Sequence, residues 1–339
     1  MKKNGILVVL FSTVLVFGLL VVGCGNPSGG ENGNGGTPPG AWVAGGIYPY
    51  TGPSGYIYGI AYGEGRFIAG GLYGNTAYTT DGGVTWTAGG NLPSNESISV
   101  IAYDGAGRFV AGGTDMAYTT DGGVTWTAAT TRSYFGSIYD IAYDGASRFV
   151  VVGASGGTAY TTDGGVNWTT LFNWPYSSDT ILSIAYGAGR FVAAGQGGKT
   201  AYSTNGGVTW TAGGTWPHVG GGFDHSIESI AYDGTGRFVA VGDTGRTAYS
   251  TDGGVTWTAG ETVLDGHCAF TAIVYDGVGC FVAVGGDDTG LAYYTTNGGV
   301  TWTGLGETHT DVLWGIAYDG AGRFVAGGDE GTTAYIDFE

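Results

Sequence analysis

Aromatic, acidic and histidine side chains gather in a few segments of the chain that have no counterpart elsewhere in it. These candidate residues are Trp174, Tyr176, Trp216, His218, Asp224, His225, Asp265, His267, His309, Asp311 and Trp314. Aromatic planes beside acidic groups suit a sugar, because its apolar face can stack on a ring while its hydroxyls donate hydrogen bonds to carboxylates. We therefore predict that these residues form a ligand-binding surface.

Two other interpretations of the same residues remain open. The rings can instead seal loops against a packed core. The histidines could hold a transition metal, if His218 converges with His225 or with His267. Asp224 would then be a further ligand. The sequence has no HExxH or close His-x-His pattern that would fix such a geometry, so we predict no metal and no cofactor.

A hairpin repeat separates these segments. Copies of the stretch YSTDGGVTWT occupy residues 78–87, 118–127, 160–169, 202–211, 249–258 and 294–303. Thr and Tyr suit a pleated surface, and Asp-Gly-Gly supplies the positive φ that a tight turn needs. Each copy is predicted to be a β-hairpin in which the Asp accepts N–H groups of its own turn. Asn205 and Asn297, which replace the Asp in two copies, can accept the same bonds.

A second unit, with the pattern I-A-Y-D-G-x-G-R-F-V-A-x-G, precedes each hairpin. It begins at Ile60, Ile101, Ile141, Ile184, Ile230, Ile273 and Ile316, at spacings of 41, 40, 43, 46, 43 and 43 residues. The unit holds two strands, so each full repeat has four strands and the length of a propeller blade. Residues 41–339 are therefore predicted to form an all-β, seven-bladed β-propeller with four-stranded blades.

The two ends of this domain complement each other. The last repeat stops at Asp337 without a fourth strand, and residues 41–46 match residues 85–90, where a fourth strand is expected. The N-terminal strand is thus predicted to close the ring, which removes the open sheet edge.

The predicted propeller has two different faces. On one, which we call the repeat face, lie the turns between first and second strands and the Asp-Gly-Gly turns. The other, the variable face, carries the turns between second and third strands, the connections between blades and all the candidate residues. Residues that recur around a ring belong to the packing of each blade. We therefore assign the repeated arginines, such as Arg66 and Arg108, to structure.

The first 40 residues have the features of an export signal and a tether. Lys2 and Lys3 precede an apolar run over residues 6–22, and residues 1–24 end in Val-Val-Gly-Cys24. An uncleaved transmembrane helix is the alternative. Residues 25–40 have the Gly, Asn and Pro content of a flexible linker. The ending resembles the lipobox of bacterial lipoproteins, which implies lipidation of Cys24 and a place at the outer membrane or cell surface.

The chain is strongly acidic, with 28 acidic and 11 basic residues and a net charge of -17. Nucleic acids are recognised through basic patches, so we expect no nucleic-acid partner. We expect a monomer.

The hairpin repeat resembles the Asp-box, [S/T]-x-D-x-G-x-T-W, of sialidase-like propellers. Sialidases hold the substrate carboxylate with three arginines, but here only Arg132 and Arg246 lie outside the repeated position, so sialidase activity is not expected. Another glycoside hydrolase stays as the alternative, because such an enzyme needs two carboxyl groups about 5–9.5 Å apart. The candidates are Asp224, Glu228, Asp265, Glu307 and Asp311.

The repeat also resembles the seven-bladed, lipid-anchored propellers of the photosystem II stability and assembly factor type. That resemblance implies a scaffold or binding module rather than an enzyme, so we assign no catalytic residue. We expect an exported lipoprotein whose propeller binds a glycan or a protein through its variable face.

Overall fold

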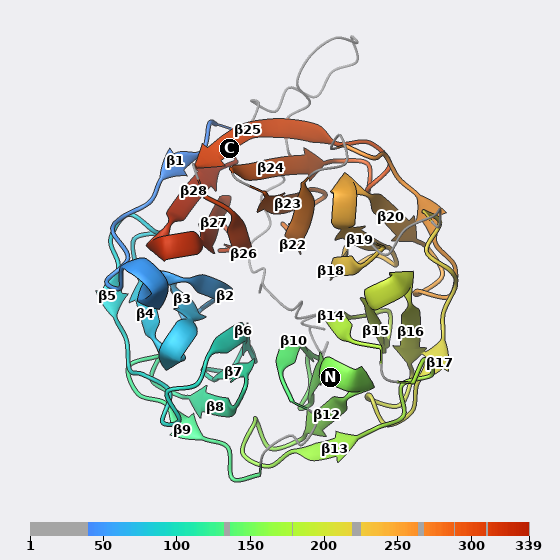
Figure 1. Cartoon of the computed structure of the whole chain (residues 1–339), viewed down its shortest axis with the longest axis horizontal. Coiled ribbons are helices and arrows are strands. Elements are labelled where there is room, and N and C mark those ends of the chain that lie inside the picture. The colour runs from blue at the N-terminus through green and yellow to red at the C-terminus, as the bar shows by residue number, and fades with distance from the viewer. Residues whose placement is uncertain are drawn as a thin grey trace, which may run out of the picture.

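The computed structural model describes residues 40–338, except for residues 132–135, 178, 219–224, 264–267, 288 and 310. These residues form seven four-stranded antiparallel sheets arranged in a ring (Figure 1), which confirms the predicted seven-bladed, all-β propeller. The predicted signal sequence with Cys24, and the linker up to residue 39, lie outside the described residues. In the described part of the chain, no helix is long and apolar enough to cross a bilayer.

Each blade begins at the ring centre and runs outward in sequence order, apart from the last. The innermost strands are β2 (Ile57–Gly63), β6 (Ile98–Tyr103), β10 (Ile138–Tyr143), β14 (Ile181–Gly187), β18 (Ile227–Tyr232), β22 (Ala269–Tyr275) and β26 (Leu313–Tyr318). The second strands are β3 (Arg66–Gly71), β7 (Phe109–Gly113), β11 (Phe149–Gly153), β15 (Arg190–Gly195), β19 (Phe238–Gly242), β23 (Phe281–Gly286) and β27 (Arg323–Gly328).

The outer half of each of the first six blades contains the hairpin repeat, whereas β28 and β1 form the outer half of the seventh. The third strands are β4 (Thr76–Thr79), β8 (Met116–Thr119), β12 (Thr158–Thr161), β16 (Thr200–Ser203), β20 (Thr247–Ser250), β24 (Gly290–Thr295) and β28 (Thr333–Asp337). The fourth strands are β5 (Thr87–Ala88), β9 (Thr127–Ala128), β13 (Thr169–Leu171), β17 (Thr211–Ala212), β21 (Thr258–Ala259), β25 (Thr303–His309) and β1 (Val43–Ala44). Short 3₁₀ turns on the variable face include η2 (Leu72–Gly74), η5 (Asp243–Gly245) and η6 (Asp329–Gly331).

The N-terminal strand closes the ring, as the sequence predicts. In β1, Val43 pairs with Tyr335 and Ala44 with Ala334 of β28. The N–H of Gly46 then donates to the carbonyl of Gly83 in the first blade, at 2.8 Å. The segment thus completes the last blade and also touches the first.

The core lies between the blades. Second strands such as β7 are buried along their whole length, because a neighbouring blade covers each face. Ile68 of the first blade, for example, packs in one cluster with Phe109 and Trp126 of the second. Each blade therefore depends on both neighbours for its burial, as in other repeat proteins.

The hairpin turns have the predicted hydrogen bonds. One carboxylate oxygen of Asp81 accepts the N–H of Thr85 at 2.8 Å and the hydroxyl of Thr79 at 2.7 Å, and the other accepts the Thr85 hydroxyl at 2.6 Å. Burial raises the pKa of Asp81, but the combined hydrogen bonds lower it to about 2. The side-chain oxygen at the equivalent position accepts the same N–H bond in the other five hairpins, at Asp121, Asp163, Asn205, Asp252 and Asn297. At Asn205 and Asn297 the side-chain amide donates to the following Thr hydroxyl instead of accepting from it. The six hairpin tryptophans are all buried.

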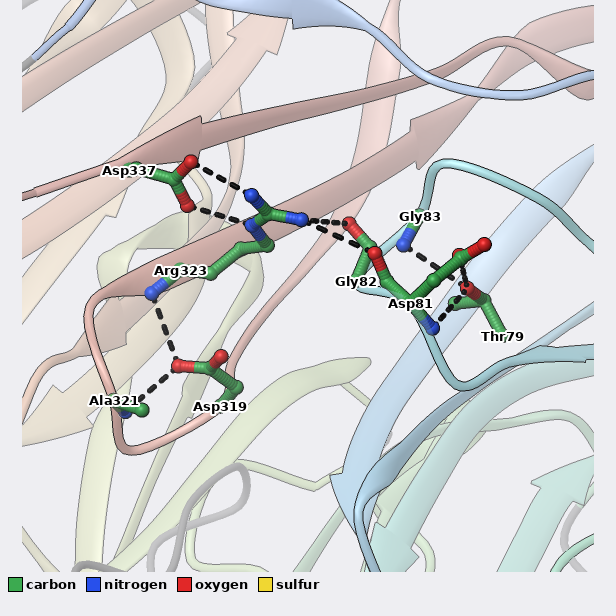
Figure 2. Close-up of polar contacts among 8 residues, drawn as sticks. All are labelled: Thr79, Asp81, Gly82, Gly83, Asp319, Ala321, Arg323 and Asp337. Atoms are coloured by element: carbon green, nitrogen blue, oxygen red, sulfur yellow. Dashed lines mark hydrogen bonds and ion pairs between the residues drawn. The ribbon is translucent and has the colours of Figure 1, made fainter.

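The repeated arginines join neighbouring blades on the repeat face. Each guanidinium stacks on a tyrosine of its own blade, with 4.3 to 5.1 Å from its central carbon to the ring centroid. It also donates to a carbonyl in the next blade's Asp-Gly-Gly or Asn-Gly-Gly turn. Arg323 does this across the closure seam, reaching Asp81 and Gly82 while it pairs with Asp337 (Figure 2). Their assignment to structure is confirmed.

Blade six departs from this pattern, and the fold explains the departure. Cys280 stands in its arginine position, and the blade that follows has no Asp-Gly-Gly turn to receive a guanidinium. Phe338 instead lies against Tyr294, with ring centroids 6.0 Å apart, and against Phe324 at 4.9 Å. An aromatic contact near the C-terminus thus replaces the cation–π contact of the other blades.

Candidate functional site

All seven innermost strands contain a β-bulge near their start, on the variable face. In β2 the register shifts between Ile57 and Gly59, so Tyr58 is the extra residue, and equivalent shifts occur in the other six blades. A bulge sets two residues opposite one on the partner strand. The extra residues are Tyr58, Ser99, Tyr139, Leu182, Glu228, Thr271 and Trp314.

These seven residues line a cavity at the centre of the ring, which we call the channel mouth. The cavity has a volume of about 400 Å³, within the range of small-ligand sites. Its lining also includes residues that follow the bulge, among them Val100, Asp140, Ser229 and Ala272. Every blade therefore contributes to one site. Unlike the repeated positions, these residues differ in chemistry from blade to blade.

Aromatic rings occupy one part of the channel mouth. Trp314 is 38% exposed and lies edge-on to Tyr58 of the neighbouring first blade, with ring centroids 6.1 Å apart. The indole N–H of Trp314 donates to a carboxylate oxygen of Asp329 in η6, at 2.5 Å, which fixes the ring at the rim. Tyr139 of the third blade is 40% exposed. These rings offer stacking surfaces that a ligand can reach.

Asp140 joins the third and fourth blades. One carboxylate oxygen accepts the hydroxyl of Ser183 and the N–H of Ile184, both at 2.8 Å, and the other accepts the N–H of Ile141. Burial raises the pKa of Asp140 to about 6, although these hydrogen bonds oppose the shift. Ser183 in turn accepts the N–H of Ile230 in the fifth blade. The Asp140 carboxylate is therefore occupied in holding strands together.

Glu228 has a different environment in the same cavity. Burial, with a smaller contribution from the nearby Asp243 carboxylate, raises the pKa of Glu228 to about 7. Among the described residues, none donates a hydrogen bond to its carboxyl group. Glu228 is thus an acidic group of the channel mouth that is available to a ligand.

Trp174 and Trp216, by contrast, belong to the core. Trp174 is 6% exposed and packs edge-on against Trp210, and Trp216 is 0% exposed and packs against Trp257. Neither ring has a face open to a ligand, so we leave both out of the proposed binding surface. The alternative interpretation, that loop aromatics seal the blades, describes these two residues.

Three other candidates contribute to loop structure on the variable face. The hydroxyl of Tyr176 donates to the carbonyl of Thr200 at 2.9 Å, and its ring carries the ammonium of Lys199. His218 bonds through Nε2 to the carbonyl of Thr247 at 2.7 Å. His225 bonds through Nδ1 to the guanidinium of Arg246. None of these three lines the channel mouth.

The last candidates are spread along the chain. Asp311 accepts the hydroxyl of Thr332 at 2.7 Å. His309 ends β25, but its side chain, like Asp224, Asp265 and His267, lies outside the described residues. In the part of the chain that is described, no three His, Cys, Asp or Glu side chains converge as metal ligands would. Of the candidates whose side chains the structure describes, only Trp314 lines the channel mouth.

Comparisons with known proteins agree with the fold. The BNR/Asp-box repeat family model matches residues 77–88, 117–128 and 248–259. No curated protein sequence matches the chain significantly. Among solved structures, YCF48 from Cyanidioschyzon merolae is similar, with 18% identity, a TM-score of 0.66, and 88% of this chain and 99% of that one covered.

Two further solved structures have the same fold. A structure of YCF48 bound to D1 peptide has 18% identity and a TM-score of 0.67, with 88% of this chain and 96% of that one covered. The WD40 repeats of RRP9 have 10% identity and a TM-score of 0.68, with 88% and 98% covered. The chain is thus a seven-bladed propeller with BNR/Asp-box repeats, similar in fold to YCF48.

Proposed function

We propose that the propeller is a non-catalytic binding module that holds a protein partner at its channel mouth. The observation that carries this proposal is the bulge in each innermost strand, because it directs a non-repeating side chain from every blade into one open cavity. Repeated residues maintain the ring, whereas residues that differ between blades can recognise one partner. The YCF48 complex adds support, since that propeller of similar fold binds a D1 peptide.

A glycan is the competing ligand for this site. Trp314 and Tyr139 could stack on a sugar, and Glu228 could accept its hydroxyls. Panning the purified protein against a random peptide library and against a glycan array separates the two ligands. The proposal is supported if peptides bind the protein and compete with one another for the channel mouth. Retention on glycans alone contradicts it.

Glycoside hydrolysis is the alternative function, because two carboxyl groups with raised pKa values share the cavity. Glu228 has the pKa of a general acid, but Asp140 already accepts bonds from Ser183, Ile184 and Ile141. A glycosidase needs both carboxyl groups for the reaction. Binding therefore fits the site better. Hydrolysis of a chromogenic glycoside that disappears in Glu228→Gln would favour the enzyme instead.

Replacing Trp314 is expected to weaken binding without unfolding the protein. Because the ring is partly exposed at the rim, Trp314→Ala should weaken binding to a selected peptide. We expect the binding free energy to become less favourable by about 1–3 kcal/mol, as at other aromatic hot spots. Isothermal titration measures this change, and thermal melting checks the fold. Phe172→Ala is the matched control, since Phe172 is 67% exposed on the variable face and does not line the cavity. Equal affinity of Trp314→Ala and the parent protein would remove this ring from the site.

We further propose that residues 1–24 direct export and that Cys24 is lipidated, on the basis of the sequence pattern alone. Cys24→Ser should then move the protein from the membrane fraction to the aqueous fraction after cell lysis, since the acyl chains supply the membrane affinity. Continued membrane partition of the variant with an intact N-terminus would favour a transmembrane helix.

A further inference from the structure

The described lining of the channel mouth combines acidic residues, aromatic rings and aliphatic side chains, and it includes no lysine, arginine or histidine. Glu228 of the fifth blade supplies a carboxylate that is open to a ligand, whereas the carboxylate of Asp140 in the third blade is already bonded to Ser183, Ile184 and Ile141. Tyr58, Tyr139 and Trp314 supply the rings, from the first, third and seventh blades. Both kinds of group attract a cation, carboxylates through their charge and ring faces through the quadrupole of their π-electrons.

Glu228 is the group in this cavity that most lacks a partner. Taking a carboxylate out of water is costly unless a hydrogen bond or an opposite charge compensates it. The described residues give Glu228 neither, and the charge that acts on it, the carboxylate of Asp243, is of the same sign. A cation that enters the channel mouth would therefore find an acidic group whose charged form it stabilises.

The basic groups that the structure describes on the variable face, Lys199 and Arg246, do not compete for this position. The ammonium of Lys199 lies over the ring of Tyr176, and the guanidinium of Arg246 contacts His225. Both side chains belong to the outer part of the face, away from the cavity lining. The channel mouth is thus acidic at its centre.

Cation–π contacts, which a cationic ligand would make with the rings of the channel mouth, already occur within the protein. Six guanidinium groups already stack on tyrosine rings within the blades, at 4.3 to 5.1 Å. At the channel mouth, Trp314 and Tyr139 have exposed faces that no cation of the described chain covers. A lysine or arginine side chain from a partner fits such a surface.

We propose that the channel mouth recognises a basic side chain of the protein partner, which enters the cavity, pairs with Glu228 and lies against the ring of Trp314. The inference rests on the proposed function and names the chemistry of its ligand. The net charge of -17 agrees with it, because an acidic protein attracts basic partners and speeds their encounter.

The test is a selection with the purified full-length protein in mild detergent against a random heptapeptide library. We expect the retained peptides to be enriched in lysine or arginine at one position. In a synthetic copy of such a peptide, acetylating that lysine, or replacing that arginine with the neutral and nearly isosteric citrulline, should weaken binding at least tenfold, because the positive charge is lost.

Variants then locate the contact. Glu228→Gln should weaken binding of the basic peptide about tenfold or more, since it removes the charge that pairs with the ligand. The acetylated peptide should bind the parent protein and Glu228→Gln equally weakly. Glu96→Gln is the matched control, because Glu96 is exposed in the connection before β6 and does not line the cavity. It should leave the affinity unchanged.

Two other results would contradict the proposals, and they separate the basic-ligand inference from the proposed binding function. If retained peptides compete at the channel mouth but carry no basic residue, or if Glu228→Gln binds as well as the parent, the basic-ligand inference is wrong and the binding function stands. If no peptide is retained and the glycan array gives the ligand, the proposed protein partner is wrong as well. Thermal melting of each variant shows that the loss of binding does not come from unfolding.

Discussion

Deleting residues 41–46 is expected to lower the free energy of unfolding by roughly 3–5 kcal/mol, because it removes the strand that closes the ring. Val43 and Ala44 would no longer pair with β28, and the bonds of Gly45 and Gly46 to Thr333 and the first blade would be lost. The largest part of the loss comes from Trp42, which packs on the core cluster of the sixth and seventh blades.

Chemical denaturation of the parent and the deletion variant measures this difference. A deletion of residues 31–36, which has the same length but falls in the glycine-rich segment, is the matched control and should leave the midpoint unchanged. The deletion of 41–46 should also expose the edge of β28 and promote association between copies of the chain, which light scattering detects. An unchanged midpoint for both deletions would show that β1 contributes nothing to the fold.

The fold could be predicted from the sequence because the residues of each repeat determine its local structure. The Asp-Gly-Gly turn requires positive φ, and its glycines adopt it, at 72° for Gly82 and 91° for Gly83. The missing fourth strand at Asp337 and the spare strand around Trp42 then determine how the ring closes. Even the one irregular arginine position has a cause in the topology, since Cys280 precedes the blade that lacks the turn.

The channel mouth was harder to predict, because the regular alternation of side chains along a strand gives the wrong orientation for the side chains at the bulges. In a regular strand, successive side chains point to opposite faces, so Tyr58 and Gly59 would not both line one cavity. The bulge places both residues in the cavity lining, and the local residue types do not predict a bulge at this position. A usable signal does exist in the variation between repeats. The two positions before each repeated Ile, such as those of Glu228 and Ser229 before Ile230, vary as a pair from blade to blade.

The burial of Trp174 and Trp216 also had a signal in the sequence. Each stands five residues after the first residue of its blade's fourth strand, and the equivalent positions hold Tyr48, Leu92 and Val263. These apolar residues pack beside the hairpin tryptophan of the following blade, as Tyr48 does against Trp86 at 5.7 Å. Aligning the connections between blades, rather than treating them as unrelated loops, would have placed both rings in the core.

Replacing Trp216 tests that assignment, and the expected effect is on stability. The ring is 0% exposed and lies in one cluster with Val192 of the fourth blade and Ile230 of the fifth. Trp216→Ala should therefore lower the free energy of unfolding by roughly 3–5 kcal/mol, the usual cost of a large cavity in a packed core. Guanidinium denaturation measures it, with the exposed Phe172→Ala as the variant that should not change.

Peptide affinity, measured on the same variants, decides whether Trp216 is a core residue or a ligand-binding residue. Under conditions where Trp216→Ala stays folded, its binding to a channel-mouth peptide should equal that of the parent, because the ring lies outside the cavity lining. Trp314→Ala should behave in the reverse way, with normal stability and weaker binding. If Trp216→Ala instead melts like the parent and loses affinity, this residue belongs to the ligand surface after all.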